Sequence, residues 1–244
     1  MKMNLKPAYR YQFKNFLKGS AVFYIIMAFI ITAFMVLSVN IGENSSINFG
    51  GYGLSVAIYM FVVGIVYIRS DLRLCLQFGI SRRTAFLSEL LSLLSISVIL
   101  SIAGELVTAS AQAVASGKPN VFVFDFYQLI YLGTDRVSPT FGQHIMSAFT
   151  NTSLFCSVCI VGMFFSLLFW RLNKFWTIVV AISIPFALNG IPYLLVKLGV
   201  NLNPLVKWIA SSPFCFILTC FVIAALVAVI DWCLLRNANI KAAK

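Results

Sequence analysis

The chain has 244 residues, of which 61% are hydrophobic and only 10% charged, whereas about a quarter of the residues in an ordinary soluble domain are charged. This composition excludes a soluble globular protein. The net charge of +11 is divided among several short segments, which argues against nucleic acid as a partner. We therefore expect an all-α integral membrane protein with a single transmembrane domain over residues 1–244.

Six stretches are apolar enough to cross a bilayer, because a spanning helix needs about 20 mostly apolar residues. They run roughly over residues 21–41, 49–68, 86–108, 145–169, 176–196 and 209–235. Most of the 18 Lys and Arg residues lie before the first stretch, between the second and third, between the fourth and fifth, and in the tail. Since cytoplasmic segments carry an excess of Lys and Arg, we expect both termini to be cytoplasmic.

Residues 1–20 carry two stripes at helical spacing. One stripe is cationic and the other is largely aromatic: Lys6, Arg10, Lys14 and Lys18 form the first, and Leu5, Tyr9, Phe13 and Phe16 with Leu17 the second. Gly19-Ser20 marks a break before the first span. The pattern predicts an amphipathic helix that lies flat on the membrane surface. The alternative is a cationic flank without fixed structure.

The loop over residues 69–84 contains residues typical of the start and the end of a short helix. Ser70-Asp71 can begin this helix, Leu72 and Leu76 form its apolar side, and Gly79 can end it. Ser81 can then cap the third span. A short amphipathic helix beneath the membrane is suited to dock in a groove on another protein. The alternative is an interfacial connector whose arginines only mark the cytoplasmic side.

The third span carries the most unusual polar content of the chain. Glu89 lies one turn from its cytoplasmic end, within helical reach of Arg82 or Arg83. Glu105 lies deeper, in a stripe of polar residues at spacings of three and four: Ser97, Ser101, Glu105, Thr108 and Gln112. An ionisable residue inside a membrane faces a bundle interior or an aqueous path, so one interpretation is a lining of the transport pathway. The other is close packing between helices through small hydroxyl side chains.

The remaining reactive side chains give weaker signals. Cys156 and Cys159 have redox or metal spacing, but their neighbours are apolar, which favours packing. His144 is the only histidine and has no nucleophile motif around it, so we expect it to be solvated or interfacial. Asp231 lies near Arg236 and is expected to pair with it at the interface. These residues predict no metal site in the chain.

Two segments carry a family resemblance. They read Gln-Phe-Gly-Ile-Ser-Arg-Arg-Thr-Ala-Phe (residues 77–86) and Leu-Leu-Arg-Asn-Ala-Asn-Ile-Lys (residues 234–241). Together with the basic N-terminal segment and the six spans, they resemble the ABC-2 type permease subunits of bacterial ABC transporters over essentially the whole chain. Within that family, the chain looks most like small permeases that export peptides, of the phenol-soluble modulin exporter type.

The resemblance implies a permease of the bacterial cytoplasmic membrane that is a dimer with a second copy or a paralogue. It implies an amphipathic peptide or another hydrophobic substrate. An ABC ATP-binding subunit would dock on a coupling helix over residues 70–78. The coupling residues would be Arg69, Asp71, Leu72, Arg73, Leu76, Gly79, Ile80, Ser81, Arg82 and Arg83.

The energy source is expected in trans. No Gly-x-x-x-x-Gly-Lys-[Ser/Thr] motif occurs in the chain, so ATP and Mg²⁺ are expected in the partner subunit. The chain itself is then neither an enzyme nor the holder of a cofactor. Two alternatives stay open: a non-transporting membrane protein such as an immunity or sensor-partner subunit, and an intramembrane enzyme.

Overall fold

The computed structural model describes residues 5–40, 47–50, 52–115, 121–133, 139–173, 175–180, 183, 197 and 203–236. Within this part of the chain, five helices are long and apolar enough to cross a membrane: α1 (Leu5–Asn40), α2 (Tyr52–Gln77), α3 (Arg82–Ala115), α5 (Phe141–Arg171) and α8 (Pro213–Arg236). The chain is accordingly a predominantly helical membrane protein. The expected fifth span, 176–196, lies mostly outside the described residues, so the count of six stays a prediction.

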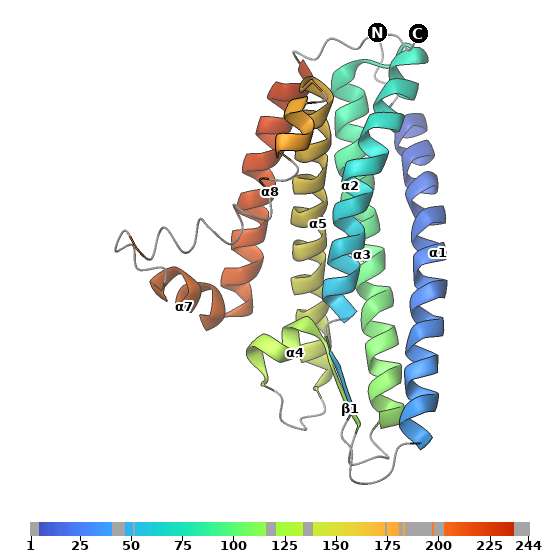
Figure 1. Cartoon of the computed structure of the whole chain (residues 1–244), viewed down its shortest axis with the longest axis vertical. Coiled ribbons are helices and arrows are strands. Elements are labelled where there is room, and N and C mark those ends of the chain that lie inside the picture. Colours follow the sequence, from blue (N-terminus) through green and yellow to red (C-terminus); the bar gives the residue numbers. More distant parts are fainter. Residues whose placement is uncertain are drawn as a thin grey trace.

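The short elements lie together at one end of the long helices. Strands β1 (Ile47–Gly50) and β2 (Val121–Phe124) form a parallel pair with Ile47 opposite Val121, and α4 (Phe126–Tyr131) follows β2 directly. We call this the sheet end. The opposite end, the turn end, holds the turn between α2 and α3, the start of α1 and the end of α8 (Figure 1). Helix α7 (Asn203–Ser211) leads into α8.

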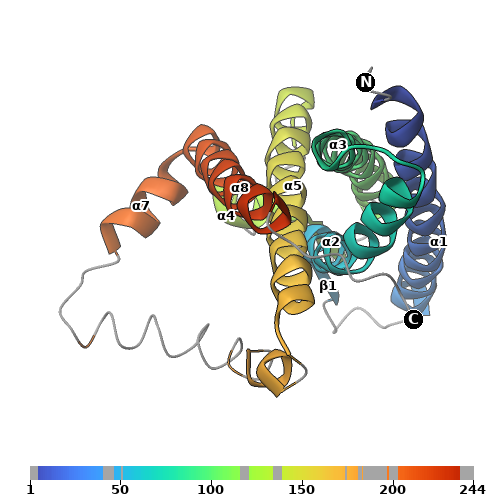
Figure 2. The same ribbon diagram turned by 90° about the horizontal axis from the view of Figure 1, so that it is seen from above.

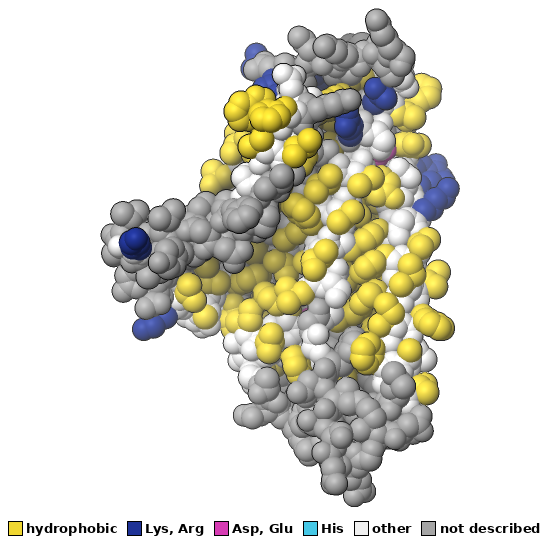
Figure 3. Space-filling model, viewed as in Figure 1, with side chains coloured by type: hydrophobic (Ala, Val, Ile, Leu, Met, Phe, Trp, Pro, Cys, Tyr) yellow, Lys and Arg dark blue, Asp and Glu magenta, His cyan; other side chains and the backbone are white. Residues whose placement is uncertain are grey.

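The helices pack in an order that differs from their order in the chain. Helix α2 packs most extensively on α5, α5 on α8, and α1 on α3. In the view along the bundle, α2, α3 and α5 lie between α1 on one side and α8 on the other (Figure 2). Hydrophobic side chains cover much of the visible outer surface between the two ends (Figure 3), as a lipid-facing surface requires.

Helix α1 corrects the prediction of a separate surface helix. It is continuous through Gly19 and Ser20, because Gly19 serves a close contact here and does not break the helix. A Cβ atom at Gly19 would lie only 2.6 Å from the hydroxyl oxygen of Tyr67. At about 1.5 Å per residue, this 36-residue helix extends about 54 Å. That is longer than the roughly 30 Å hydrocarbon core.

The two stripes of the N-terminal segment have different environments. The cationic stripe is exposed, as predicted: Lys6, Arg10, Lys14 and Lys18. In the second stripe, Tyr9, Phe13 and Phe16 are buried or half-buried against the protein, whereas Leu17 is exposed. Phe16 is buried and its ring contacts that of Tyr67, while the Tyr9 hydroxyl donates to Ser95 Oγ at 3.0 Å. The first turns of α1 are therefore held against α2 and α3.

The α2–α3 turn confirms two predicted caps. Gly79 has φ +73°, its N–H bonds to Leu76 O, and the Ile80 N–H bonds to Cys75 O; this pair of bonds is a Schellman C-cap. Ser81 caps α3, since its hydroxyl accepts from the Thr84 N–H at 3.2 Å.

The separate coupling helix over residues 70–78 is a wrong prediction. Helix α2 runs without interruption from Tyr52 to Gln77, so Ser70 and Asp71 lie inside a helix and cap nothing. Asp71 is buried against α1, where Asn15 Nδ2 donates to its Oδ1 at 3.4 Å. Its other carboxyl oxygen, Oδ2, is buried without a hydrogen-bond partner. The element between the second and third long helices is thus a helical hairpin tip.

Candidate functional site

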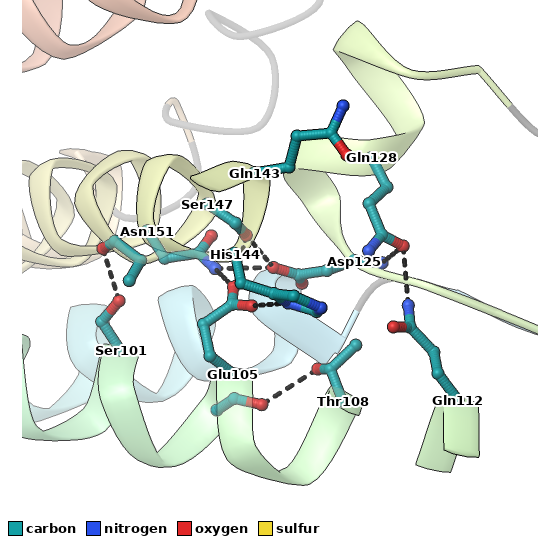
Figure 4. Close-up of polar contacts among 12 residues, drawn as sticks. Ser101, Glu105, Thr108, Gln112, Asp125, Gln128, Gln143, His144, Ser147 and Asn151 are labelled. Carbon is teal, nitrogen blue, oxygen red and sulfur yellow. Dashed lines mark hydrogen bonds and ion pairs between the residues drawn. The ribbon is translucent and has the colours of Figure 1, made fainter. Parts of the chain in front are cut away.

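A group of polar side chains converges inside the bundle near the sheet end. We call it the Glu105 cluster; its members are Glu105, Asp125, His144, Ser147 and Asn151 (Figure 4). Glu105 lies on α3, and Asp125 lies between β2 and α4. The other three come from α5, where spacings of three and four put them on one helical face. All members except the half-buried His144 are buried.

The side chains of the Glu105 cluster are linked by direct hydrogen bonds. His144 Nδ1 lies 3.1 Å from Glu105 Oε2, and Ser147 Oγ donates to Glu105 Oε1. Asn151 Nδ2 lies 3.2 Å from Glu105 Oε1 and 2.6 Å from Asp125 Oδ2. Ser147 Oγ also lies 3.2 Å from Asp125 Oδ2. The two carboxyl groups therefore share both of these donors.

Asp125 extends the network to two further elements. Its Oδ1 accepts from the Gly53 N–H of α2 at 3.2 Å, and its own N–H donates to Gln128 Oε1 of α4 at 3.3 Å. Gln112 of α3 donates to the same Gln128 oxygen at 2.9 Å. Helices α2, α3, α4 and α5 thus all meet at this cluster.

The arrangement suits proton or charge binding better than nucleophilic catalysis. In the Ser-His-Asp arrangement the serine nucleophile is hydrogen-bonded to a histidine base, but Ser147 is bonded to the two carboxyl groups. Among the described residues, no group of three or more His, Cys, Asp or Glu side chains is arranged to hold a metal ion. Two buried carboxyl groups and one imidazole in an apolar surrounding are ionisable groups of the kind that mark functional positions within membranes.

The predicted stripe on α3 is a buried seam. Ser97, Ser101, Glu105 and Thr108 are all buried, whereas Gln112 is half-buried. Ser101 Oγ donates across to Ala148 O of α5 at 2.5 Å, while Ser97 and Thr108 donate to carbonyl groups of their own helix. Ser101 and Glu105 therefore join α3 to α5, and whether the seam also lines a path stays a prediction.

His144 is half-buried and its ring is paired with Glu105, while its place at a membrane interface stays a prediction. Asp125, Ser147 and Asn151 were not predicted. A signal for the last two existed in the sequence, since His144, Ser147 and Asn151 recur at one-turn and two-turn spacing in the fourth span. No local pattern indicates that Asp125 joins them.

Two ion pairs considered from the sequence, Glu89 with Arg82 or Arg83 and Asp231 with Arg236, are absent among the described residues. Glu89 is buried and pairs with neither neighbouring arginine. Arg82 Nη1 instead donates to the carbonyl oxygen of Arg236 at 2.9 Å, at the end of α8. Asp231 is fully buried, and both of its carboxyl oxygens lack a hydrogen-bond partner, so it forms no interfacial pair with Arg236. Cys156 and Cys159 are buried, free thiols.

The predicted coupling residues separate into two sets. Asp71 and Leu72 are buried inside the bundle and present nothing to a partner. The others are exposed or half-buried: Arg69, Arg73, Leu76, Gly79, Ile80, Ser81, Arg82 and Arg83. Leu72 is buried because the apolar side of this part of α2 faces the hydrophobic core of the chain.

The turn end contains a pocket of about 500 Å³. The first turns of α1 contribute Pro7 and Tyr11 to its wall, and the hairpin tip contributes Leu74, Phe78 and Ile80. A neighbouring hollow is lined in part by exposed cations of α1: Lys6, Arg10 and Lys14. Phe78, in the wall of this pocket, is 76% exposed.

No family model matches the chain, and neither a curated protein nor a solved structure matches it.

Proposed function

We propose that the chain is the permease subunit of an ATP-driven transporter of the ABC-2 type in the bacterial cytoplasmic membrane. The observation that carries the proposal is the turn-end pocket. It combines an apolar wall, an exposed aromatic side chain and a cationic rim at the end of the molecule that the distribution of Lys and Arg assigns to the cytoplasm. These are features of a docking site for a soluble partner.

The partner is proposed to be an ABC ATP-binding subunit. The chain has no phosphate-binding loop of its own, so ATP-driven transport by this chain would need an ATP-binding site on another protein. The hairpin tip enters the contact through Phe78 and Ile80, and the first turns of α1 enter it through Tyr11. This replaces the separate coupling helix by a site built from two segments that lie far apart in the sequence.

The fold provides a mechanical connection from that site to the Glu105 cluster. Helix α2 is one uninterrupted rod of 26 residues, about 39 Å long at 1.5 Å per residue. One end of it contributes Leu74 to the docking pocket, and Gly53 at the other end binds Asp125. A displacement of the hairpin tip by a partner would therefore be transmitted to the polar cluster near the opposite membrane surface.

The substrate and the assembly follow from the resemblance. An amphipathic peptide or another hydrophobic molecule is the proposed substrate, moved outward between this chain and a second copy or a paralogue. The buried α3 seam from Ser97 to Thr108 is the proposed polar part of the path. Its serine and threonine hydroxyls are engaged with backbone carbonyls in the present conformation.

The test compares two phenylalanines at opposite ends of the molecule. Phe78 is 76% exposed at the turn end, and Phe141 is 78% exposed at the start of α5. We expect Phe78→Asp to reduce co-purification of the ATP-binding subunit encoded beside this chain at least tenfold, and to abolish the stimulation of its ATPase activity. Phe141→Asp is the matched control and should leave both unchanged.

The outcomes separate the function classes. Equal co-purification of the ATP-binding subunit with both variants would show that the docking site does not lie at the turn end. If no ATP-binding protein accompanies the wild-type chain at native expression levels, the permease assignment fails and a non-transporting immunity or sensor-partner subunit takes its place.

A further inference from the structure

The Glu105 cluster contains more hydrogen-bond acceptors than its hydrogens can satisfy. Ser147 Oγ contacts carboxyl oxygens of both Glu105 and Asp125, but a hydroxyl group has only one hydrogen to donate. With both carboxyl groups ionised, one of these contacts joins two oxygen atoms without a hydrogen between them. A protonated carboxyl group removes the conflict, because it donates to Ser147 while Ser147 donates to the other carboxylate.

A second side chain in the cluster also lacks a donor. Asn151 directs its Nδ2 group to the two carboxyl groups, and its Oδ1 atom is buried without any hydrogen-bond partner. A methyl group built on Gly53 would lie 3.3 Å from this oxygen and 2.9 Å from Asp125 Oδ1. The two acceptor oxygens therefore border the same small space, and Asn151 Oδ1 finds no donor there.

The charged groups around the cluster cannot balance two ionised carboxyl groups. The groups that face it are His144 from α5 and the hydroxyl groups of Tyr52 on α2 and Tyr24 on α1. The pair of His144 and Glu105 is the single ion pair among the described residues. A charged His144 balances one carboxylate, and the other would then remain buried with an uncompensated charge, which is costly.

We propose that the Glu105 cluster binds one proton, carried by the carboxyl groups of Glu105 and Asp125 that share Ser147 and Asn151, and that this proton helps to keep the β2–α4 segment docked on α3 and α5. Asp125 attaches this segment to α5 through Ser147 and Asn151, and Gln112 of α3 bonds to the segment at Val123 and Gln128. Loss of the proton places two carboxylates on the same donors and favours separation of Asp125 from Glu105. The cluster is then a proton-controlled latch at the sheet end.

The sign of the pH dependence follows from the number of bound protons. The docked state holds one proton more than the separated state at pH values where exposed carboxyl groups are ionised, so docking is favoured at low pH and weakened as the pH rises. For one proton, the equilibrium constant for docking falls about tenfold per pH unit. Neutral amide side chains at either carboxyl position should remove this dependence.

The experiment measures amide hydrogen exchange of residues 121–133 in the full-length protein, reconstituted in lipid nanodiscs, from pH 5 to pH 9. After correction for the intrinsic exchange rate, the wild type should lose protection by up to tenfold per pH unit. Glu105→Gln and Asp125→Asn should show a flat profile. Asp231→Asn is the matched control, because it neutralises another buried carboxyl group that lies outside the cluster, and it should keep the wild-type slope.

Infrared spectroscopy of the same samples provides a second readout. The wild type should show a carbonyl band of a protonated carboxylic acid that is absent from Glu105→Gln or Asp125→Asn and disappears as the latch opens. A slope that persists in both of these variants but is lost in His144→Gln would place the proton on the imidazole and overturn the proposal. So would a wild-type profile that is flat in pH, or one that responds to replacing Na⁺ by choline at constant pH.

Discussion

Gly64 on α2 lies directly against the carbonyl group of Cys159 on α5, and a Cβ atom at position 64 would overlap that oxygen. The contact is reciprocal, since Gly162 on α5 meets the carbonyl group of Phe61 on α2 in the same way. Two glycines thus let the backbones of the most extensively packed helix pair approach closely. Small residues have this role in membrane helix pairs, where dispersion and not the hydrophobic effect holds helices together.

Gly64→Ala is predicted to destabilise the protein by about 1–3 kcal/mol, the usual cost of overpacking a well-packed interface. The added methyl group meets backbone atoms of α5, which cannot rotate away as a side chain can. The control is Gly142→Ala in the first turn of α5, where an added Cβ has no neighbour within 4 Å. It should be neutral or slightly stabilising, because alanine favours the helix.

The measurement for this pair is the temperature at which half of the detergent-solubilised protein stays monodisperse in fluorescence-detected size-exclusion chromatography. A Gly64→Ala variant that is as stable as Gly142→Ala would show that α2 and α5 are farther apart than described here.

Arg82→Ala is predicted to weaken the attachment of α8 to α3. Arg82 Nη1 donates to the carbonyl oxygens of Leu235 and Arg236, and a cation at the C-terminus of a helix also interacts favourably with the helix dipole. We expect a loss of about 1 kcal/mol. Trypsin sensitivity near the end of α8 should rise in parallel.

Arg83→Ala is the matched control for this prediction. Arg83 is the exposed neighbour of Arg82 and has the same charge, so its removal tests whether charge alone matters. Equal effects of the two substitutions on proteolysis would exclude a capping role for Arg82.

The local patterns that proved right depend only on neighbours in the chain. The Gly79 and Ser81 caps are set by φ and by bonds within five residues, and the sequence alone therefore predicted them. The exposed stripe that starts at Lys6 follows from helical periodicity. The spacing of the α3 stripe likewise predicted a buried polar face that includes Glu105.

The predictions that failed depend on tertiary contacts. Gly19 could be a helix break or a site of close approach, and only the position of Tyr67 decides between them. Asp71 has the residue type of a helix start, but it lies inside α2 and bonds to Asn15 of α1. Asp125 and His144 belong to segments separated from α3 in sequence, so their meeting with Glu105 could not be read from local spacing.

Leu72→Ala is predicted to cost about 2–5 kcal/mol, the range for truncating a fully buried leucine. Leu72 has no exposed surface, so the cost is a loss of packing inside the chain and not of contact with a partner. Leu87→Ala, at a leucine that is 44% exposed on the neighbouring helix, should cost far less in the same size-exclusion assay.

The loss of ATPase coupling in Leu72→Ala should follow the loss of folded protein. If coupling were lost while thermal stability stayed at the wild-type value, Leu72 would belong to the docking surface, and its burial here would not represent the free subunit.

The orientation of the chain is tested by two single cysteines in a variant that lacks the native cysteines. Phe78→Cys lies at the turn end and Phe141→Cys at the sheet end, and both positions are highly exposed. The bias of Lys and Arg toward the turn end predicts that this end is cytoplasmic. A membrane-impermeant maleimide should therefore label Phe141→Cys in intact cells and Phe78→Cys only in inverted vesicles or after permeabilisation. The reverse labelling pattern would show the opposite orientation in the membrane. The docking pocket would then lie outside the cell, which would exclude an intracellular ATPase as its occupant.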